Sequence, residues 1–131
     1  MWSWNGEQLE HSFTLQAHDF GIVSIDVSKD GRMAATSSLD SIIRLWDLDT
    51  TEEIQKINAE PFNSWLVKFF PDGETIATGT IDGKVALHNI RTGDKLPKEF
   101  GSSKNFAHSI AVVSLFVNIL YIFFIYITLY M

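Results

Sequence analysis

The chain contains the three residue types of a nucleophilic triad, because a hydroxyl, an imidazole and a carboxylate are available at Thr36, His18 and Asp40. In such a triad the imidazole takes the proton of the hydroxyl, and the carboxylate orients the imidazole. The same polar groups are equally suited to a buried structural network, in which each donor finds an acceptor. Which of the two hypotheses holds depends on the secondary-structure elements that position these side chains.

The remaining polar residues do not have the spacing of a metal or phosphate site. No pair of the four histidines has close ligand spacing; they are His11, His18, His88 and His108. The segment GTIDGK, 79–84, resembles a phosphate loop, but three residues separate its glycines where the Walker pattern has four, and Val85 follows the lysine where Ser or Thr is needed. No G-x-G-x-x-G, G-x-S-x-G or H-E-x-x-H motif occurs. We therefore predict no enzyme activity, no metal, no cofactor and no small-molecule substrate.

Length, charge and composition narrow the class of protein further. The chain has 131 residues, the length of one average domain, and a net charge of −6. Its basic residues are spread out, so we expect no direct binding of nucleic acid. The absence of cysteine excludes disulfides and thiolate metal sites and fits a reducing compartment. The start, MWSWNGEQLE, lacks the basic and apolar regions of a secretory signal.

Short strand-like runs separated by turn residues dominate the chain before residue 110. The run IVSIDVS, 22–28, alternates apolar and polar residues with the period of a half-buried strand. The segment TTEEIQKIN, 50–58, predicts another short strand, with a helix over 48–57 as the alternative. Three Asp-Gly pairs supply the positive φ of tight hairpin turns, at 30–31, 72–73 and 82–83. The pattern predicts an all-β protein.

A shift of 42 residues superimposes one part of the chain on the next. The shift aligns identical residues at Ala17 and Ala59, Phe20 and Phe62, Asp30-Gly31 and Asp72-Gly73, Ala35-Thr36 and Ala77-Thr78, Asp40 and Asp82, Leu45 and Leu87, and Thr50 and Thr92. Apolar character is kept between Ile25 and Val67 and between Ile43 and Val85. A period near 42 with four short strands per unit is typical of propeller blades.

The segment SSLDSIIRLWDL, 37–48, resembles a WD-repeat protein. A unit of that family runs from a Gly-His-like start through SPDG and SxD motifs to a strand that ends in Trp-Asp, and this chain has SKDG at 28–31 and Trp46-Asp47. The resemblance implies that His18, Thr36, Asp40 and Trp46 form a buried structural network in place of a triad. Asp40 would orient the ring of His18, which would reach Thr36, which would accept the indole N–H of Trp46.

The second unit departs from the family pattern. Glu60 stands where the family has His, and His88-Asn89 replaces Trp-Asp, whereas Thr78 and Asp82 remain. We therefore expect a degenerate network in this unit, formed by Glu60, Thr78, Asp82 and His88, and greater reliance on apolar packing.

Three segments carry a closer resemblance within the family: DFGIVSIDVS, SSLDSIIRLWDL and ETIATGTIDGKV. They resemble the WD-repeat subunit of the Ski complex, whose animal relatives also belong to the Paf transcription-elongation complex. This resemblance implies a non-catalytic scaffold in the nucleus and cytoplasm, with Ski and Paf subunits as protein partners and roles in exosome-linked mRNA decay and transcription elongation.

The family also implies where partners bind, because contacts gather on the narrow face where one strand ends and the next blade begins. The matching positions are Asp19, Phe20, Phe62, Asn63 and Trp65. Trp65 occupies the slot of Val23 in the first unit, and large aromatic residues are enriched at binding hot spots. The alternative for Trp65 is simple packing between blades.

The resemblance covers roughly residues 2–113 and implies an incomplete propeller with an apolar segment after it. We expect residues 1–14 to end a preceding blade, 15–56 and 57–98 to form two full four-stranded blades, 99–113 to open a third blade, and 114–131 to form the tail. A closed propeller of this family has about seven blades. Two blades leave open sheet edges and an exposed inter-blade face.

The apolar run over 110–130 allows three hypotheses. It is long enough to span a bilayer, and the nearest basic residues precede it, so the chain could be a tail-anchored membrane adaptor with a cytosolic N-terminus. Alternatively, the family pattern stops at Ser114 and the later residues are those of A/T-rich codons, as in a truncated, non-functional product read beyond an exon boundary. In the third hypothesis the tail covers the exposed blade face as a strand or helix, and its composition favours a strand.

Overall fold

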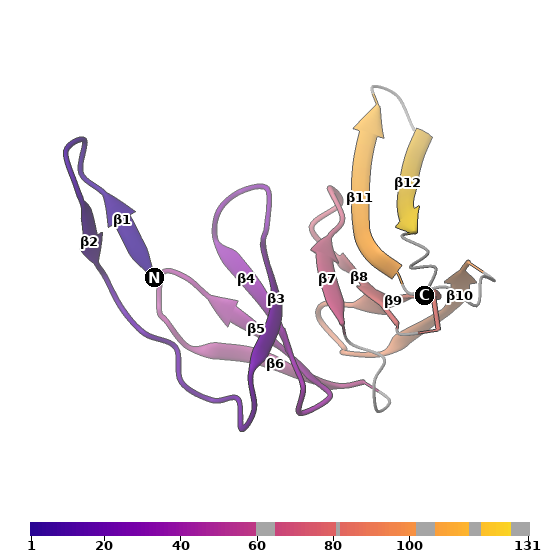
Figure 1. Ribbon diagram of the computed structural model, residues 1–131, viewed down its shortest axis with the longest axis horizontal. Coiled ribbons are helices and arrows are strands. Elements are labelled where there is room, and N and C mark those ends of the chain that lie inside the picture. The colour runs from indigo at the N-terminus through magenta and orange to yellow at the C-terminus, as the bar shows by residue number, and fades with distance from the viewer. Residues whose placement is uncertain (60–64, 81, 102–106, 116–118, 127–131) are drawn as a thin grey trace, which may run out of the picture.

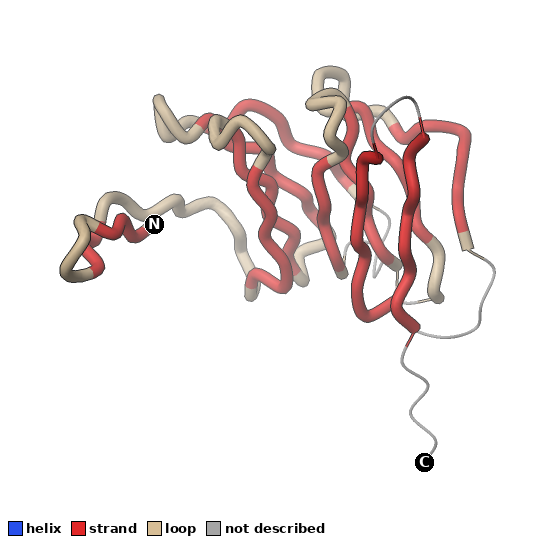
Figure 2. The backbone as a smooth tube through the Cα atoms, turned by 90° about the horizontal axis from the view of Figure 1, so that it is seen from above, coloured by secondary structure: helices blue, strands red, loops and turns tan. Residues whose placement is uncertain are grey.

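The computed structural model describes residues 1–59, 65–80, 82–101, 107–115 and 119–126, which form strands joined by turns (Figures 1 and 2). The strands are β1 (Trp2–Trp4), β2 (Leu9–His11), β3 (Ile22–Val27), β4 (Met33–Ser38), β5 (Ile42–Asp47), β6 (Glu53–Asn58), β7 (Leu66–Phe69), β8 (Thr75–Gly79), β9 (Val85–Asn89), β10 (Lys95–Phe100), β11 (Ala107–Leu115) and β12 (Ile119–Tyr126). These described ranges contain no helix long and apolar enough to cross a membrane.

Two four-stranded antiparallel sheets stand side by side in the middle of the molecule (Figure 1). The first blade has the order β3-β4-β5-β6, and the second has β7-β8-β9-β10, so each is a simple meander. Their first strands, β3 and β7, are neighbours at the interface. This is the arrangement of adjacent blades in a partial propeller, and the predicted all-β fold is confirmed. The last strands, β6 and β10, each extend two residues beyond the expected blade ends at 56 and 98.

The segment over 53–58 is a strand, so the helix alternative for 48–57 is wrong. In β6 the side chain of Ile57 is buried, whereas its neighbours Lys56 and Asn58 are exposed. This alternation has the period of a strand. Pairing of Ile57 with Ile43 of β5 carries both side chains into the core between the blades.

Tight turns join the strands where the Asp-Gly pairs predicted them. Gly31, Gly73 and Gly83 have φ angles of 75°, 70° and 79°, a region that residues with a Cβ rarely adopt. The preceding Asp30 and Asp72 each accept backbone amides of the following turn residues. The carboxylate therefore closes the turn while the glycine supplies its conformation.

The main apolar core lies between the two blades. Its buried members from the first blade are Ala35, Ile43, Leu45 and Ile57, and those from the second are Val67, Phe69, Ile76 and Ile90. Fully burying one Ile, Leu or Phe side chain contributes about 1.5–3 kcal/mol. Packing of one blade on the next thus supplies much of the stability of either sheet.

The strand β11 covers the opposite face of the second blade, in the place of the first strand of a third blade. Ile110 of β11 is buried against a second apolar cluster formed by Phe70, Ala77, Val85 and Leu87. Antiparallel pairing with β12 runs from Leu115 opposite Ile119 to Ala107 opposite Tyr126. Strand β11 therefore continues across the expected boundary between residues 113 and 114. Residues 119–126 form a strand, where the membrane-anchor hypothesis requires a helix.

The N-terminal residues form a separate two-stranded sheet of β1 and β2 (Figure 1). Trp2 pairs with His11, and their rings meet edge to face with centroids 5.2 Å apart. Both strands are exposed along their length, and so are the large side chains of Trp2, Trp4 and Leu9.

Candidate interaction surface and its supporting polar network

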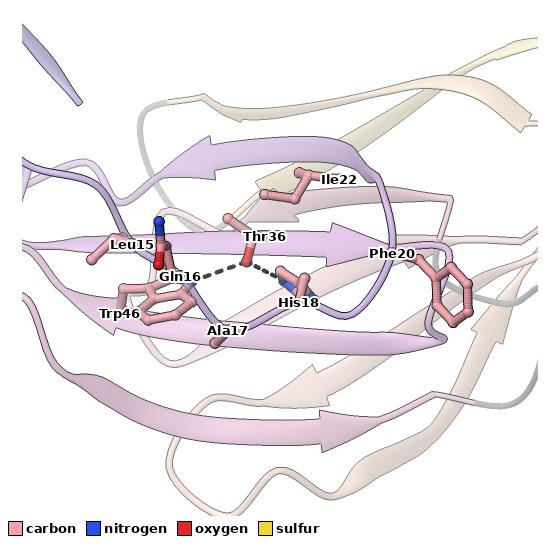
Figure 3. A pocket seen from close by; sticks show the side chains of 8 residues that line it. All are labelled: Leu15, Gln16, Ala17, His18, Phe20, Ile22, Thr36 and Trp46. Carbon is pink, nitrogen blue, oxygen red and sulfur yellow. Dashed lines mark hydrogen bonds between the residues drawn. The ribbon is translucent and has the colours of Figure 1, made fainter.

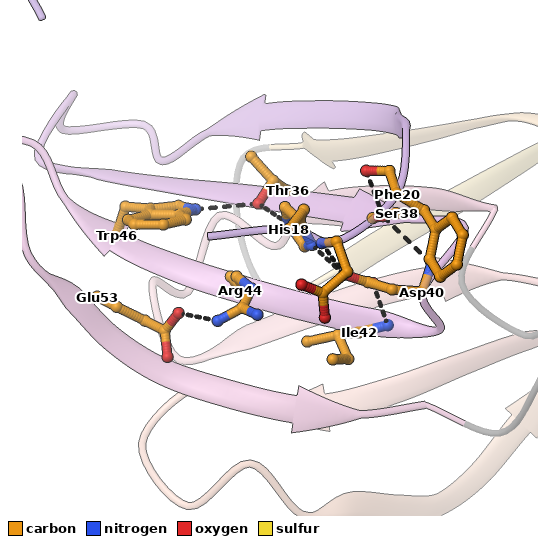
Figure 4. Close-up of polar contacts among 10 residues, drawn as sticks. His18, Phe20, Thr36, Ser38, Asp40, Ile42, Arg44, Trp46 and Glu53 are labelled. Atoms are coloured by element: carbon orange, nitrogen blue, oxygen red, sulfur yellow. Dashed lines mark hydrogen bonds and ion pairs between the residues drawn. The ribbon is translucent and has the colours of Figure 1, made fainter. Parts of the chain in front are cut away.

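The structure brings His18, Thr36, Asp40 and Trp46 together in one chain of hydrogen bonds (Figure 4). The Nδ1 atom of His18 lies 2.9 Å from the Oδ2 atom of Asp40, and its Nε2 atom lies 2.8 Å from the Oγ1 atom of Thr36. The indole N–H of Trp46 donates to the same Oγ1 atom over 2.9 Å. With Nδ1 protonated, every donor in this chain meets an acceptor.

The environment of Asp40 keeps its carboxylate ionised. Burial raises its pKa, but the hydrogen bond from His18, the bond from the Ile42 amide and the bond from the Asp19 amide outweigh burial, so the pKa of Asp40 lies below its ordinary value. The Thr36 hydroxyl is buried and bonded to both His18 and Trp46. These contacts hold strands and a loop together.

Two members of the equivalent set in the second blade are in contact among the described residues. The Oγ1 atom of Thr78 lies 3.2 Å from the Nε2 atom of His88. Asp82, at the position of Asp40 in the first blade, accepts a hydrogen bond from Thr80 and pairs with the Nζ atom of Lys84 at 3.3 Å. The expected fourth member, Glu60, lies outside the described residues.

His88 is a buried imidazole on β9. Its Nδ1 atom has no partner among the described residues. Burial, and then the positive charge of Lys95, hold the pKa of His88 below its ordinary value. The ring is therefore neutral at neutral pH, and it stands in the sequence position that Trp46 occupies in the first blade.

The network anchors the loop that presents Asp19 and Phe20. The amide of Asp19 donates to Asp40 over 3.3 Å, and the carbonyl oxygen of Phe20 accepts from the Ser38 hydroxyl over 3.1 Å. The Phe20 side chain is nevertheless 66% exposed and points away from the His18 ring (Figures 3 and 4). A rigid backbone thus carries an aromatic side chain into solvent.

The other expected contact residues are divided between described and undescribed parts of the chain. Trp65, just before β7, is 37% exposed, and its amide donates to Gly79 over 2.9 Å. Phe62 and Asn63 lie outside the described residues.

Two exposed apolar residues beside Phe20 were missed by sequence reasoning. Leu39, in the turn between β4 and β5, is 58% exposed, and its amide donates to Gly21 over 3.0 Å. Ile22, the first residue of β3, is also exposed. A signal was available, because Leu39 and Ile81 are apolar residues at the same position of both repeats, inside a polar turn. We call Asp19, Phe20, Ile22, Leu39 and Trp65 the loop-end surface.

A hollow of ≈ 510 Å³ adjoins this surface (Figure 3). The residues that line it are Leu15, Gln16, Ala17, His18, Phe20, Ile22, Thr36 and Trp46. His18, Thr36 and Trp46 of the network thus line the hollow together with Phe20 and Ile22 of the loop-end surface.

Paired meander blades with an internal His–Thr–Trp–Asp network define the class of WD-repeat propellers. The family model "WD domain, G-beta repeat" matches residues 9–47. The crystal structure of RRP9 WD40 repeats superimposes with a TM-score of 0.60 at 16% sequence identity, covering 68% of this chain and 28% of that one. Together with the fold, these matches support assignment of the chain to the WD-repeat family.

Several WD-repeat proteins are similar in sequence. The WD repeat-containing protein SL1-17 of Schistosoma mansoni is 37% identical over 94 residues, which are 72% of this chain and 31% of that protein. The WD repeat-containing protein VIP3 of Arabidopsis thaliana is 29% identical over 121 residues, covering 82% and 38%. A guanine nucleotide-binding protein subunit beta of Oryza sativa subsp. japonica is 32% identical over 81 residues, covering 60% and 21%. The chain thus spans roughly a third of the length of the first two relatives.

Proposed function

We propose that the chain is a non-catalytic scaffold that binds other proteins through the loop-end surface. The observation that carries this proposal is the exposure of Phe20, Ile22 and Leu39 on a backbone that hydrogen bonds to Asp40, Ser38 and Gly21 hold in place. Large apolar side chains gathered on rigid loops are typical of interaction sites, because they bury area at little cost in conformational entropy. WD-repeat proteins in general act as interaction scaffolds.

We further propose that the partners are subunits of the Ski and Paf complexes and that the protein works in the nucleus and cytoplasm. Support comes from the resemblance of DFGIVSIDVS, SSLDSIIRLWDL and ETIATGTIDGKV to the WD-repeat subunit of those complexes. The first segment contains Asp19, Phe20 and Ile22 of the loop-end surface, and the second contains Leu39.

Binding of the full chain to purified Ski and Paf subunits, measured by titration calorimetry, tests both proposals. Phe20→Ala, Leu39→Ala and Trp65→Ala should each weaken binding, and the strongest of them by roughly 30-fold, as expected for a hot-spot residue. Ile54→Ala is the matched control, because Ile54 is an exposed apolar residue on β6, outside the loop-end surface. Equal weakening by Ile54→Ala would refute the surface. Binding to neither complex would refute the choice of partners.

A further inference from the structure

Two side chains of β3 bind the backbone of β7 across the interface between the blades. The amide of Val67 donates to the Oγ atom of Ser24 over 3.3 Å. The amide of Phe69 donates to the Oδ2 atom of Asp26 over 2.8 Å, and the Nζ atom of Lys68 lies 2.8 Å from Oδ1 of the same carboxylate. We call these three contacts the inter-blade latch.

The latch satisfies groups that the second blade cannot satisfy by itself. β7 is the edge strand of its sheet and pairs only with β8, so one side of its backbone has no ladder partner within the blade. Val67 and Phe69 are buried, and a buried amide without an acceptor is strongly unfavourable. Side chains of the first blade therefore accept the hydrogen bonds that the backbone of a neighbouring strand would otherwise accept.

The latch also sets the stagger between the inner strands of the two blades. It joins Ser24 to Val67 and Asp26 to Phe69, each pair 43 residues apart, although the sequence repeat is 42 residues. The two strands run in the same direction, because both partners advance by two residues. If the same alignment is extended to the first residues of β3 and β7, Trp65 lies level with Ile22. The one-residue stagger thus determines how far along β3 the start of β7, and with it Trp65, lies.

We propose that Asp26 is a positioning residue for partner binding, because it holds β7, and through β7 Trp65, in register with the rest of the loop-end surface. Asp26 lies within β3, and its side chain is directed at β7, so it acts without touching the partner. This inference rests on the proposed function of the surface. It adds that the surface is a composite of two blades and depends on their alignment.

The position of Trp65 can be measured without any partner. The full chain is labelled with 5-fluorotryptophan, and the ¹⁹F resonance of Trp65 is assigned with Trp65→Phe. Asp26→Ala should shift or broaden this resonance and increase its accessibility to a soluble quencher. Asp26→Asn should leave it close to wild type, because the amide oxygen still accepts from Phe69 and the half-exposed pair with Lys68 contributes little.

A matched control separates positioning from general loss of stability. Asp72→Ala removes a carboxylate that also accepts two backbone amides, from Glu74 and Thr75, but within a turn of the second blade. It should leave the Trp65 resonance unchanged. If Asp26→Ala fails to fold, Ser24→Ala removes only the weaker amide bond and should shift the resonance in the same direction by a smaller amount.

Affinity for purified Ski subunits provides the second measurement. Asp26→Ala should weaken binding roughly 2- to 30-fold, the range of residues that act on a site through others, and Asp26→Asn should restore it. An unchanged Trp65 resonance in Asp26→Ala, or an equal change in Asp72→Ala, would overturn the inference. If the wild-type chain binds no Ski subunit, the proposed partner fails, whereas the ¹⁹F experiment still decides whether Asp26 positions Trp65.

Discussion

Replacement of Thr36 by valine should test whether the polar network stabilises the first blade. The two side chains have the same shape, so the change removes a hydroxyl and opens no cavity. The N–H group of Trp46 then loses its acceptor and the Nε2 atom of His18 loses its donor. Thr36 and Trp46 are both buried, so their polar groups are largely removed from bulk solvent.

The size of the effect follows from the two groups left unsatisfied. Each of the two buried polar groups without a partner costs about 1–3 kcal/mol, so Thr36→Val should lower the free energy of unfolding by about 2–6 kcal/mol. Thr36→Ser keeps the hydroxyl and loses one methyl group, and it should cost about 1 kcal/mol. A loss that is larger for valine than for serine identifies hydrogen bonding, rather than packing, as the cause.

Urea titrations followed by circular dichroism measure both variants. The midpoint should fall in Thr36→Val while the m-value stays constant, which shows that stability changed and the exposed area did not. Because small domains are marginally stable, the series is repeated in trimethylamine N-oxide, which favours the compact state and keeps a weakened variant measurable. A loss below about 0.5 kcal/mol, typical of a neutral surface change, would refute the network as a source of stability.

Two further perturbations follow from single residues. The pKa of His88 is held below its ordinary value by burial and by Lys95. Below about pH 6.5 this histidine therefore binds more protons in the unfolded chain than in the folded chain. The free energy of unfolding should therefore fall as the pH drops from 7 toward 5. Urea titrations over a pH series should show this dependence in the wild-type chain and not in His88→Phe. A pH dependence that persists in His88→Phe would show that another group causes it. Ser41 has a φ angle of 63°, which costs a non-glycine residue about 1–2 kcal/mol, so Ser41→Gly should raise Tm by about 4 °C or more. A lower Tm in a thermal melt would show that the serine side chain contributes more than the strain costs.

The order of strands and turns was predictable because the same turn motif occurs in both repeats. Asp30-Gly31 and Asp72-Gly73 occupy equivalent positions, and both form the tight turns expected of them. Local chemistry of this kind depends on a few adjacent residues, so it can be inferred without knowledge of the rest of the fold.

Contacts between distant residues were harder to infer. Asp82 pairs with Lys84, which stands where the first repeat has Ile42, and this ion pair within the turn was not anticipated from the sequence. Ile22 and Leu39 were missed because an apolar residue near a strand end is ordinarily assigned to the core. The stagger of the inter-blade latch was also beyond prediction, since it depends on how two twisted sheets meet.

The two blades use different chemistry on equivalent faces, and the packing explains why. Ile25 of β3 is 60% exposed, whereas Val67, its counterpart in the repeat, is fully buried against the first blade. The face of the second blade that carries Val67, Thr78 and His88 is thus covered by apolar side chains of the first blade. The face that carries Ile25, Thr36 and Trp46 has no such cover within the described residues. There the loop that contains His18 lies against the sheet, and the hydrogen bonds of the polar network hold it in place. Loss of the hydroxyl at Thr36 should therefore cost more stability than the same loss at Thr78.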